Sequence, residues 1–135
     1  MSHERTLLVG LKPLIVAAGI PTGSVVYGDL PTAPDRAVAL NCYAALDEAK
    51  VALTRLRVQV MVRGIVNDSL DAGDLADTIF DALHGLENLW FGGVHLVQCF
   101  RVSRIPLGID SAKRTTRADN YECDVDLPVT AGRPF

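Results

Sequence analysis

The sequence has few cysteines and lacks a long uninterrupted apolar segment. Its three cysteines, Cys42, Cys99 and Cys123, are odd in number and far apart in the chain, and each falls within a predicted strand. This pattern predicts neither a disulfide framework nor a clustered metal site, so we expect buried thiols in a reducing compartment. The longest apolar stretch, residues 7–20, is interrupted by a lysine and a proline and is shorter than the roughly 20 residues that span a membrane. We therefore expect no membrane span, and the N-terminal residues predict no secretion signal.

The sequence also lacks an excess of positive charge. Its 13 Lys and Arg residues stand against 16 Asp and Glu residues, which gives a formal net charge of -3. Domains that bind nucleic acids in general neutralise many phosphates with a basic surface. The acidic balance of this chain therefore argues against a general nucleic-acid binder.

The short motifs that carry enzymatic mechanisms are missing as well. The chain contains no nucleophile elbow, phosphate-binding loop, zinc-protease motif or Cys-x-x-Cys pair. Asp74, Asp77 and Asp81 are three and four residues apart, which is typical of one helix face and not of a calcium loop. The three histidines are well separated, and we interpret His84 as a helix-end residue that interacts with the helix dipole. We predict no catalytic residue, no cofactor and no metal ion.

The composition is that of an ordinary globular protein. Hydrophobic residues make up 49% of the chain and charged residues 21%, over a length of 135 residues. A chain of this length can bury about 65–70% of the surface that it exposes when unfolded. We therefore expect a single folded domain that spans residues 1–135.

Two segments alternate between apolar and polar residues as a half-buried strand does. In the first segment, 55–63, four apolar residues alternate with Arg55, Arg57, Gln59, Met61 and Arg63. In the last segment, Tyr121, Cys123, Val125, Leu127 and Val129 alternate with Asn120, Glu122, Asp124 and Asp126. One sheet face is therefore core, while the other carries a basic row and an acidic row. These rows could pair across adjacent strands of one subunit or between neighbouring subunits.

The remaining pattern predicts an α+β fold, a mostly antiparallel sheet with helices packed on one face. The predicted helices are residues 4–18, with a kink or restart near residue 12 because of Pro13, and a segment that Asp71 caps and Gly85 ends. Further strands are predicted at 24–27, 37–43, 94–103 and 117–129, with a loop at 31–35, a basic loop at 105–116 and an open assignment for 44–52.

Two clusters have alternative interpretations. Lys113, Arg114 and Arg117 are either a solvated basic loop or a contact with an acidic neighbouring subunit or with phosphates. Trp90 and Phe91, followed by two glycines that permit a sharp turn, either cap the core where the second helix meets the sheet or form a hot spot in a protein interface.

The order of these features resembles a known protein family. The resemblance rests on Tyr27-Gly28-Asp29-Leu30-Pro31, Pro34-Asp35 before a strand, Val58-Gln59-Val60-Met61-Val62-Arg63-Gly64, Leu75-Ala76 to Leu83-His84-Gly85, Arg104-Ile105-Pro106-Leu107-Gly108 and Asn120-Tyr121-Glu122. In this order they resemble the tail terminator and minor capsid proteins of long-tailed bacteriophages, over most of the chain after residue 24. The motifs are turn residues and alternating strands, so none of them is a catalytic signature.

The resemblance implies a structural virion protein without enzymatic activity. Such a subunit forms a ring, commonly a hexamer, that caps the head-proximal end of the tail tube, stops tail polymerisation and joins the tail to the head connector. Its expected partners are further copies, the tail tube protein and head-tail connector proteins, with DNA passing through the lumen without specific binding. Assembly would take place in the cytoplasm of the bacterial host. Candidate interface residues are Arg55, Arg57, Arg63, Trp90, Phe91, Lys113, Arg114, Arg117, Glu122, Asp124 and Asp126.

Two other functions stay open at this point. A head-tail connector or stopper subunit belongs to the same structural class and would occupy a position nearer the head. A small cytoplasmic ligand-binding or enzymatic α+β domain belongs to a different class, and the corner at Trp90 and the following glycines would be its pocket.

Overall fold

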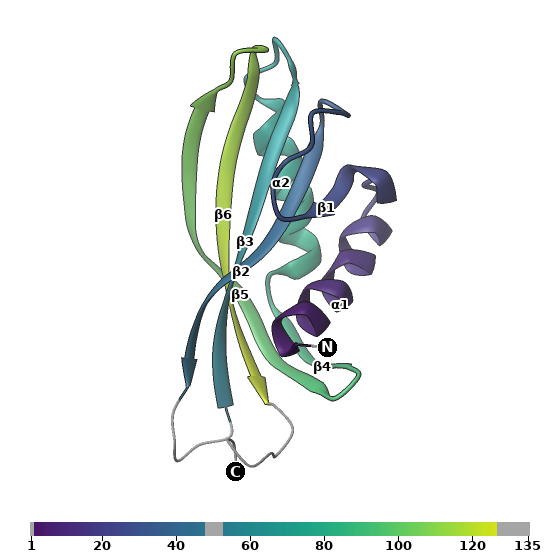
Figure 1. Ribbon diagram of the computed structural model, residues 1–135, viewed down its shortest axis with the longest axis vertical. Coiled ribbons are helices and arrows are strands. Elements are labelled where there is room, and N and C mark those ends of the chain that lie inside the picture. Colours follow the sequence, from purple (N-terminus) through teal and green to yellow (C-terminus); the bar gives the residue numbers. More distant parts are fainter. Residues whose placement is uncertain (1, 48–52, 127–135) are drawn as a thin grey trace.

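A computed structural model describes residues 2–47 and 53–126 of the chain, and Figure 1 shows its arrangement of helices and strands. The elements in chain order are α1 (His3–Ala17), the short 3-10 helix η1 (Thr22–Ser24), β1 (Val25–Tyr27), β2 (Ala37–Asp47), β3 (Leu53–Val66), α2 (Asp71–Leu83), β4 (Leu86–Phe91), β5 (Val94–Ile109) and β6 (Arg114–Asp126). The predicted α+β class is confirmed.

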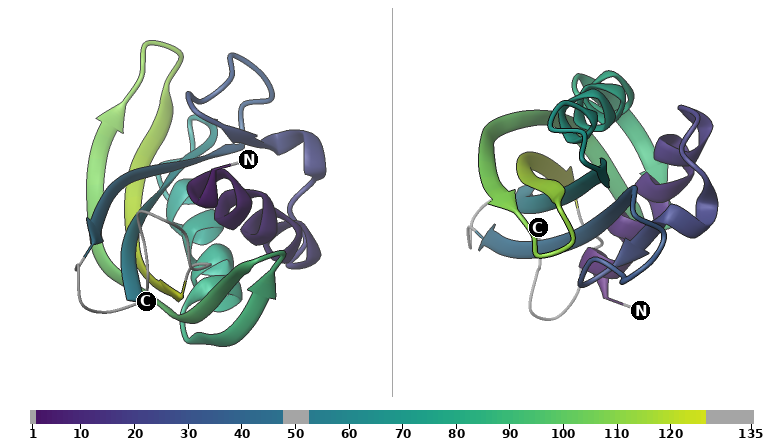
Figure 2. Two further views of the ribbon diagram at one scale, coloured as in Figure 1. Left: turned by 60° about the horizontal axis from the view of Figure 1, so that its bottom comes forward. Right: turned by 90° about the horizontal axis from the view of Figure 1, so that it is seen from above.

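The six strands form one sheet in the order β1-β2-β3-β6-β5-β4. The pairing of β1 with β2 is parallel, and the other four pairings are antiparallel. The sheet is strongly twisted, so its strands cross one another in projection in Figure 1. Figure 2 shows α1 and α2 beside one another on one side of this sheet, as the sequence predicts. Neither helix is long and apolar enough to span a membrane, within residues 2–47 and 53–126.

The core lies between the helices and the sheet face that the alternation predicted. Leu56, Val58, Val60 and Val62 of β3 are buried, and the register places Val58 opposite Tyr121 of β6. Leu7, Leu11 and Ile15 of α1 and Ala72, Leu75, Ala76, Ile79 and Leu83 of α2 cover this face. The helix α2 thus buries one apolar stripe, with Phe80 beside it only half-buried.

Of the kink or restart predicted near residue 12 of the first helix, the restart is wrong. The helix α1 continues from His3 to Ala17 with Pro13 inside it, and the side chain of Ser2 accepts a hydrogen bond from the backbone N–H of Arg5 at its start. A proline in a helix interior costs about 3 kcal/mol. Burial of three apolar side chains at four-residue spacing outweighs that cost, because each contributes about 1.5–3 kcal/mol.

The predicted cap of the second helix is also wrong. Leu70 occupies the N-cap position without a side-chain bond, and the Asp68 carboxylate accepts hydrogen bonds from the backbone N–H groups of Leu70 and Asp71. The Asp71 carboxylate instead accepts from Arg36 and from the backbone N–H of Ile65. It therefore ties the helix start to β3 and to the loop before β2. The predicted end is confirmed, because Gly85 follows the helix with a φ of 86°.

The predicted basic loop at 105–116 is wrong as well. The strand β5 continues to Ile109 and β6 begins at Arg114, so only residues 110–113 form the turn. The Asp110 carboxylate accepts hydrogen bonds from the backbone N–H groups of Ala112 and Arg114 and from the Arg114 side chain. These bonds lower the pKa of Asp110, the backbone bond from Arg114 most. An aspartate that satisfies its own turn lets the flanking strands pair up to the tip.

Other strand boundaries also differ from the predicted ones. The segment β4 is a strand that the sequence did not predict, and β2 continues through residues 44–47, which were left open. Residues 48–52 of that open segment lie outside the described residues. The last strand is described up to Asp126, so residues 127–129 of the predicted strand lie outside as well.

Candidate subunit interface

The predicted basic and acidic rows meet within one subunit. The register places Arg55 opposite Asp124 and Arg57 opposite Glu122 on adjacent strands. Arg55 Nε lies 2.9 Å from Asp124 Oδ1 and 3.3 Å from Glu122 Oε1, and Arg57 Nη2 lies 3.2 Å from the same glutamate oxygen. Gln98 Nε2 donates to Asp124 Oδ2 at 2.7 Å. Of the two alternatives, pairing across neighbouring strands is therefore the one present in the subunit.

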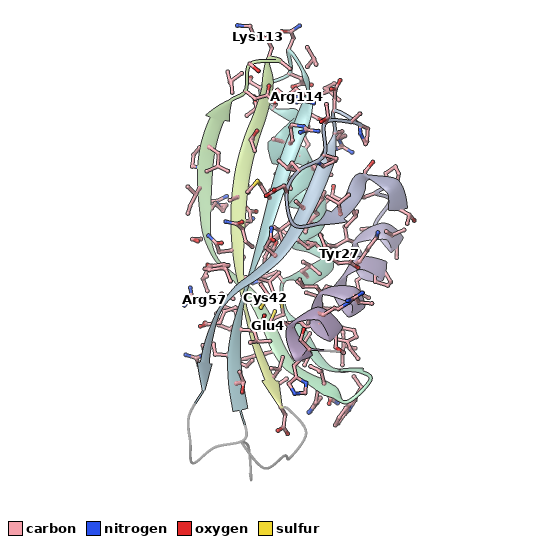
Figure 3. The ribbon with its side chains drawn as sticks, viewed as in Figure 1. Glu4, Tyr27, Cys42, Arg57, Lys113 and Arg114 are labelled. Carbon is pink, nitrogen blue, oxygen red and sulfur yellow. The ribbon has the colours of Figure 1, made fainter. Side chains whose placement is uncertain are left out.

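The two acidic side chains are buried although the helices lie on the other face. Asp124 is 2% exposed, and Glu122 is also buried. Long side chains from the neighbouring strands β3 and β5 cover them, because the strand β6 lies inside the sheet. Arg55 and Arg57 remain partly exposed, and Figure 3 shows Arg57 on the side of the sheet away from α1. Part of each of these two arginine side chains therefore stays accessible.

Arg63 is 4% exposed and holds the loop before β2. Its Nε donates to the carbonyl of Asp35 at 2.7 Å and its Nη2 to the carbonyl of Pro34 at 2.8 Å. Burial, together with the nearby charge of Arg114, lowers the pKa of Arg63. Arg63 therefore does not pair with the acidic row, although the sequence grouped it with Arg55 and Arg57 in the basic row.

Arg114 also holds the loop before β2. Its Nη1 donates to the carbonyl of Thr32 at 2.9 Å and lies 3.2 Å from Asp35 Oδ1, while its Nε pairs with Asp110. Lys113 is exposed at the turn between β5 and β6, at the top of the molecule in Figure 3. The predicted basic cluster is therefore divided between a structural anchor and an exposed tip.

Arg117, the third member of that cluster, belongs to a charge group around the buried Asp119 on the helix side of the sheet. Its Nε and Nη2 donate to Asp119 at 2.7 and 3.0 Å, and Arg101 Nη1 donates to the same carboxylate at 3.3 Å. The guanidinium of Arg101 also lies 4.1 Å from the ring centroid of Phe80. The hydrogen bond to Asp119 is the main reason that the pKa of Arg117 is raised.

Sequence reasoning missed Asp119 and Arg101. One signal for Asp119 is present in the sequence, because it falls in the same alternation phase as Tyr121, Cys123 and Val125. An acidic residue in the core phase of a strand predicts a buried charge with basic partners. No comparable signal marks Arg101, because the alternation of β5 is interrupted by three register shifts.

The structure separates the roles of Trp90 and Phe91. Trp90 is 64% exposed and stacks on His95, with ring centroids 4.3 Å apart. Phe91 is half-buried and packs on Gly10 of α1. Of the two interpretations, core capping therefore holds for Phe91, although against the first helix and not the second. The predicted sharp turn is confirmed, because Gly92 has a φ of 58° between β4 and β5.

The prediction of buried thiols is confirmed for Cys99 and Cys123, while Cys42 is half-buried. Although far apart in sequence, Cys99 and Cys123 face each other across β5 and β6 with their sulfurs 3.5 Å apart. This contact, together with burial, raises the pKa of Cys123. Within the described residues, no group of three histidine, cysteine or acidic side chains gathers as metal ligands do.

A cavity of about 460 Å³ lies beside the start of α1, away from the corner where the ligand-binding alternative placed a pocket. Its walls are Ser2, Glu4, Arg5, Leu8, Val9, Tyr27, Gly28, Leu40, Asn41 and Cys42. Glu4, Tyr27 and Cys42 are labelled there in Figure 3. Burial and the nearby charge of Glu4 raise the pKa of Cys42 to about 11, so this thiol is no activated nucleophile at neutral pH.

A family model for the bacteriophage tail terminator protein matches residues 13–127. The chain belongs to this family. The match begins in the last third of α1 and includes α2 and all six described strands in full. Family membership supports a structural protein of a phage particle.

The fold is also similar to that of a solved chain in "Virion of native gene transfer agent (GTA) particle". The TM-score is 0.62 at 19% sequence identity, and the alignment covers 83% of this chain and 84% of the other. At this identity the similarity concerns the fold alone. No curated protein matches the sequence.

Proposed function

We propose that this tail terminator family member forms a closed ring, most simply of six copies, on the head-proximal end of the tail tube. The ring stops tube polymerisation and joins the tail to the head connector. The observation that carries this proposal is the family match, because it spans the whole described sheet and α2 and not one motif.

The charges of the subunit are consistent with such a structural role. The arginines that the sequence offered as interface candidates are engaged with carboxylates or carbonyls of the same chain. A lumen lined by such neutralised pairs would let DNA pass without binding it specifically, because few phosphates could be neutralised. We therefore propose the tail tube protein and the connector as partners, in a particle that is assembled in the bacterial cytoplasm.

Some of the candidate interface residues remain accessible for contacts with these partners. Arg55, Arg57, Trp90 and Lys113 keep exposed side-chain surface, whereas Arg63 and Asp124 do not. Tryptophan and arginine are enriched among residues that dominate protein interfaces. We propose the first four as contacts with neighbouring copies or with the tube.

The proposal is tested by disrupting the gene in particles and restoring it in trans. Without the protein, electron microscopy should show tail tubes longer than the normal length, and the restored protein should return the normal length. A gold label on the restored protein should mark the head-proximal tube end. Tails of normal length that merely fail to join heads would instead support the connector or stopper alternative.

A further inference from the structure

Each edge of the sheet is covered along only half of its length. The short strand β1 pairs with residues 38–40 of β2, and the last backbone bond on that side runs from the N–H of Gly28 to the carbonyl of Leu40. Among the described residues, no strand pairs with the outer side of 41–47, which we call the β2 free edge. This edge therefore presents backbone groups that a further strand could use.

The opposite edge has the same organisation at the other end of the sheet. The strand β4 pairs with residues 94–99 of β5, and the last bonds on that side run from Gly85 N–H to the carbonyl of Cys99 and from Arg101 N–H to His84 Nδ1. Among the described residues, no strand pairs with the outer side of 102–109, which we call the β5 free edge. Its length is close to that of the β2 free edge.

Apolar side chains accompany both free edges. Leu107 is 50% exposed, Ile105 and Ile109 are similarly exposed, and Tyr43 on the β2 free edge is 54% exposed. Neighbouring exposed apolar side chains along an unpaired strand are typical of a protein interface, since an isolated soluble subunit would lose solubility through them. The two free edges cannot pair within one subunit, because they lie at opposite ends of the sheet (Figure 1).

From these observations we infer that the β5 free edge of one copy pairs with the β2 free edge of the next copy. The inference rests on the proposed ring and specifies its joint. Strand directions alternate from β2 through β3 and β6 to β5, so adding the β2 of a second copy beside β5 continues the antiparallel pattern. The joint uses two different patches, and such heterologous contacts are the kind that generate rings.

The stagger of the two free edges is compatible with this joint. Because the free edges lie at opposite ends of the sheet, each copy is shifted along the strands relative to its neighbour. A closed sheet absorbs such a shift by tilting its strands against the ring axis.

The β5 free edge also limits the contact. Pro106 has no backbone N–H to donate, and register shifts occur at 101–103 and 106–108. Proline and bulges on edge strands restrict pairing with arbitrary strands. Such an edge favours one matched partner over uncontrolled growth, and the β2 free edge of a second copy is the partner that the chain itself provides.

The test uses lysine substitutions on each free edge of the full chain. Leu107→Lys damages only the β5 free edge and Tyr43→Lys only the β2 free edge. We expect each variant alone to lose the ring at concentrations where the unmodified protein forms it, with at least a tenfold drop in the ring fraction measured by native mass spectrometry. A 1:1 mixture should give dimers, because one intact joint remains between the two variants. Val97→Lys, on the half of β5 that β4 covers and 37% exposed, is the matched control and should keep the ring.

Cysteine pairs give a second measurement that does not depend on ring stability. In a Cys42→Ser background, Tyr43→Cys combined with Ile105→Cys, Leu107→Cys or Ile109→Cys should give a ladder of disulfide-linked oligomers in rings or in assembled particles. Tyr43→Cys with Val97→Cys should not.

Each result separates the joint from the ring itself. Rings that survive either lysine substitution would overturn the edge pairing and leave the proposed ring intact. Particles that give no ladder would overturn the edge pairing as well, and only particles in which the gold label is also absent from the head-proximal tube end would overturn the proposed ring.

Discussion

Replacing Gly10 by alanine tests how α1 is fixed against the β4–β5 hairpin. A Cβ at Gly10 would overlap the ring of Phe91, with Cδ2 only 2.8 Å away and two further ring atoms closer still. Alanine is preferred over glycine in a helix interior by about 1 kcal/mol. Overpacking of a filled site costs about 1–3 kcal/mol. Since Cγ itself is among the overlapping atoms, rotation of the ring plane gives no relief, and we expect a net loss of about 1 kcal/mol in the free energy of unfolding.

Gly10→Ala should have the opposite effect on stability once the phenyl ring of Phe91 is removed. In a Phe91→Ala background an alanine at position 10 meets no aromatic side chain, so Gly10→Ala should raise the free energy of unfolding by about 1 kcal/mol through helix propensity alone. Gly73 in α2 is the matched control, because its nearest side-chain atom, Arg117 Nη1, would be 3.8 Å from an added Cβ. We expect Gly73→Ala to stabilise the protein by about 0.5–1 kcal/mol.

The test is urea unfolding of Gly10→Ala, Phe91→Ala, the double variant and Gly73→Ala. The effect of Gly10→Ala on the free energy of unfolding should differ by about 2 kcal/mol between the two backgrounds, whereas additivity errors are about 0.3–0.5 kcal/mol. If Gly10→Ala stabilised the otherwise unmodified protein as much as Gly73→Ala does, the helix would not be held against Phe91. The assignment of this phenylalanine to the core would then be refuted.

Three further predictions concern polar groups that are buried or half-buried. Asp119→Asn should lower the free energy of unfolding by about 2–4 kcal/mol in urea titrations, because it leaves Arg101 and Arg117 without their shared buried carboxylate; an unchanged midpoint would contradict the charge group. Tyr121→Phe should change stability by less than about 1 kcal/mol or raise it, because the buried hydroxyl has no hydrogen-bond partner among the described residues; a large loss in the same titration would indicate a partner. Cys42 has a pKa of about 11, against 9.0 for a free thiol, so alkylation at pH 8 should be about 100-fold slower than in the unfolded chain. The neutral thiol favours the folded state, so this contribution to stability is complete below pH 9.0 and is lost as the pH rises toward about 11; mass spectrometry of alkylated protein checks the rate.

The parts of the fold that could be predicted are those in which local pattern and burial agree. The alternation of β3 predicted its buried face, which includes Val58 and Val60, and the apolar residues of α2, among them Leu75 and Ile79, are buried at helical spacing. In both elements one face meets the core along the full length, so the sequence period is preserved.

The errors arose where a tertiary contact replaces the local signal. Asp110 closes its own turn, so residues that read as a basic loop became paired strands. In β4 the left-handed residue Asn88, with a φ of 53°, breaks the alternation that would have revealed the strand. Packing of α1 on the sheet likewise made a continuous helix out of a segment that contains Pro13.

The candidate site could be predicted only as a set of charges and not as their partners. The alternation correctly placed Arg55 and Arg57 on the same face as Glu122 and Asp124. Whether such rows pair inside a subunit depends on strand order, and the sequence of one strand does not contain that order. Arg63 was grouped with the row although its partners, backbone carbonyls of a loop, leave no trace in residue type.

The most direct test of the account is an electron cryomicroscopy map of the head-tail junction in the particle that carries this protein. The account predicts copies of the chain in a closed ring at the head-proximal end of the tube, with residues 102–109 of each copy alongside residues 41–47 of the next. A junction in which the chain is absent, or is present as single copies without mutual contact, would contradict it.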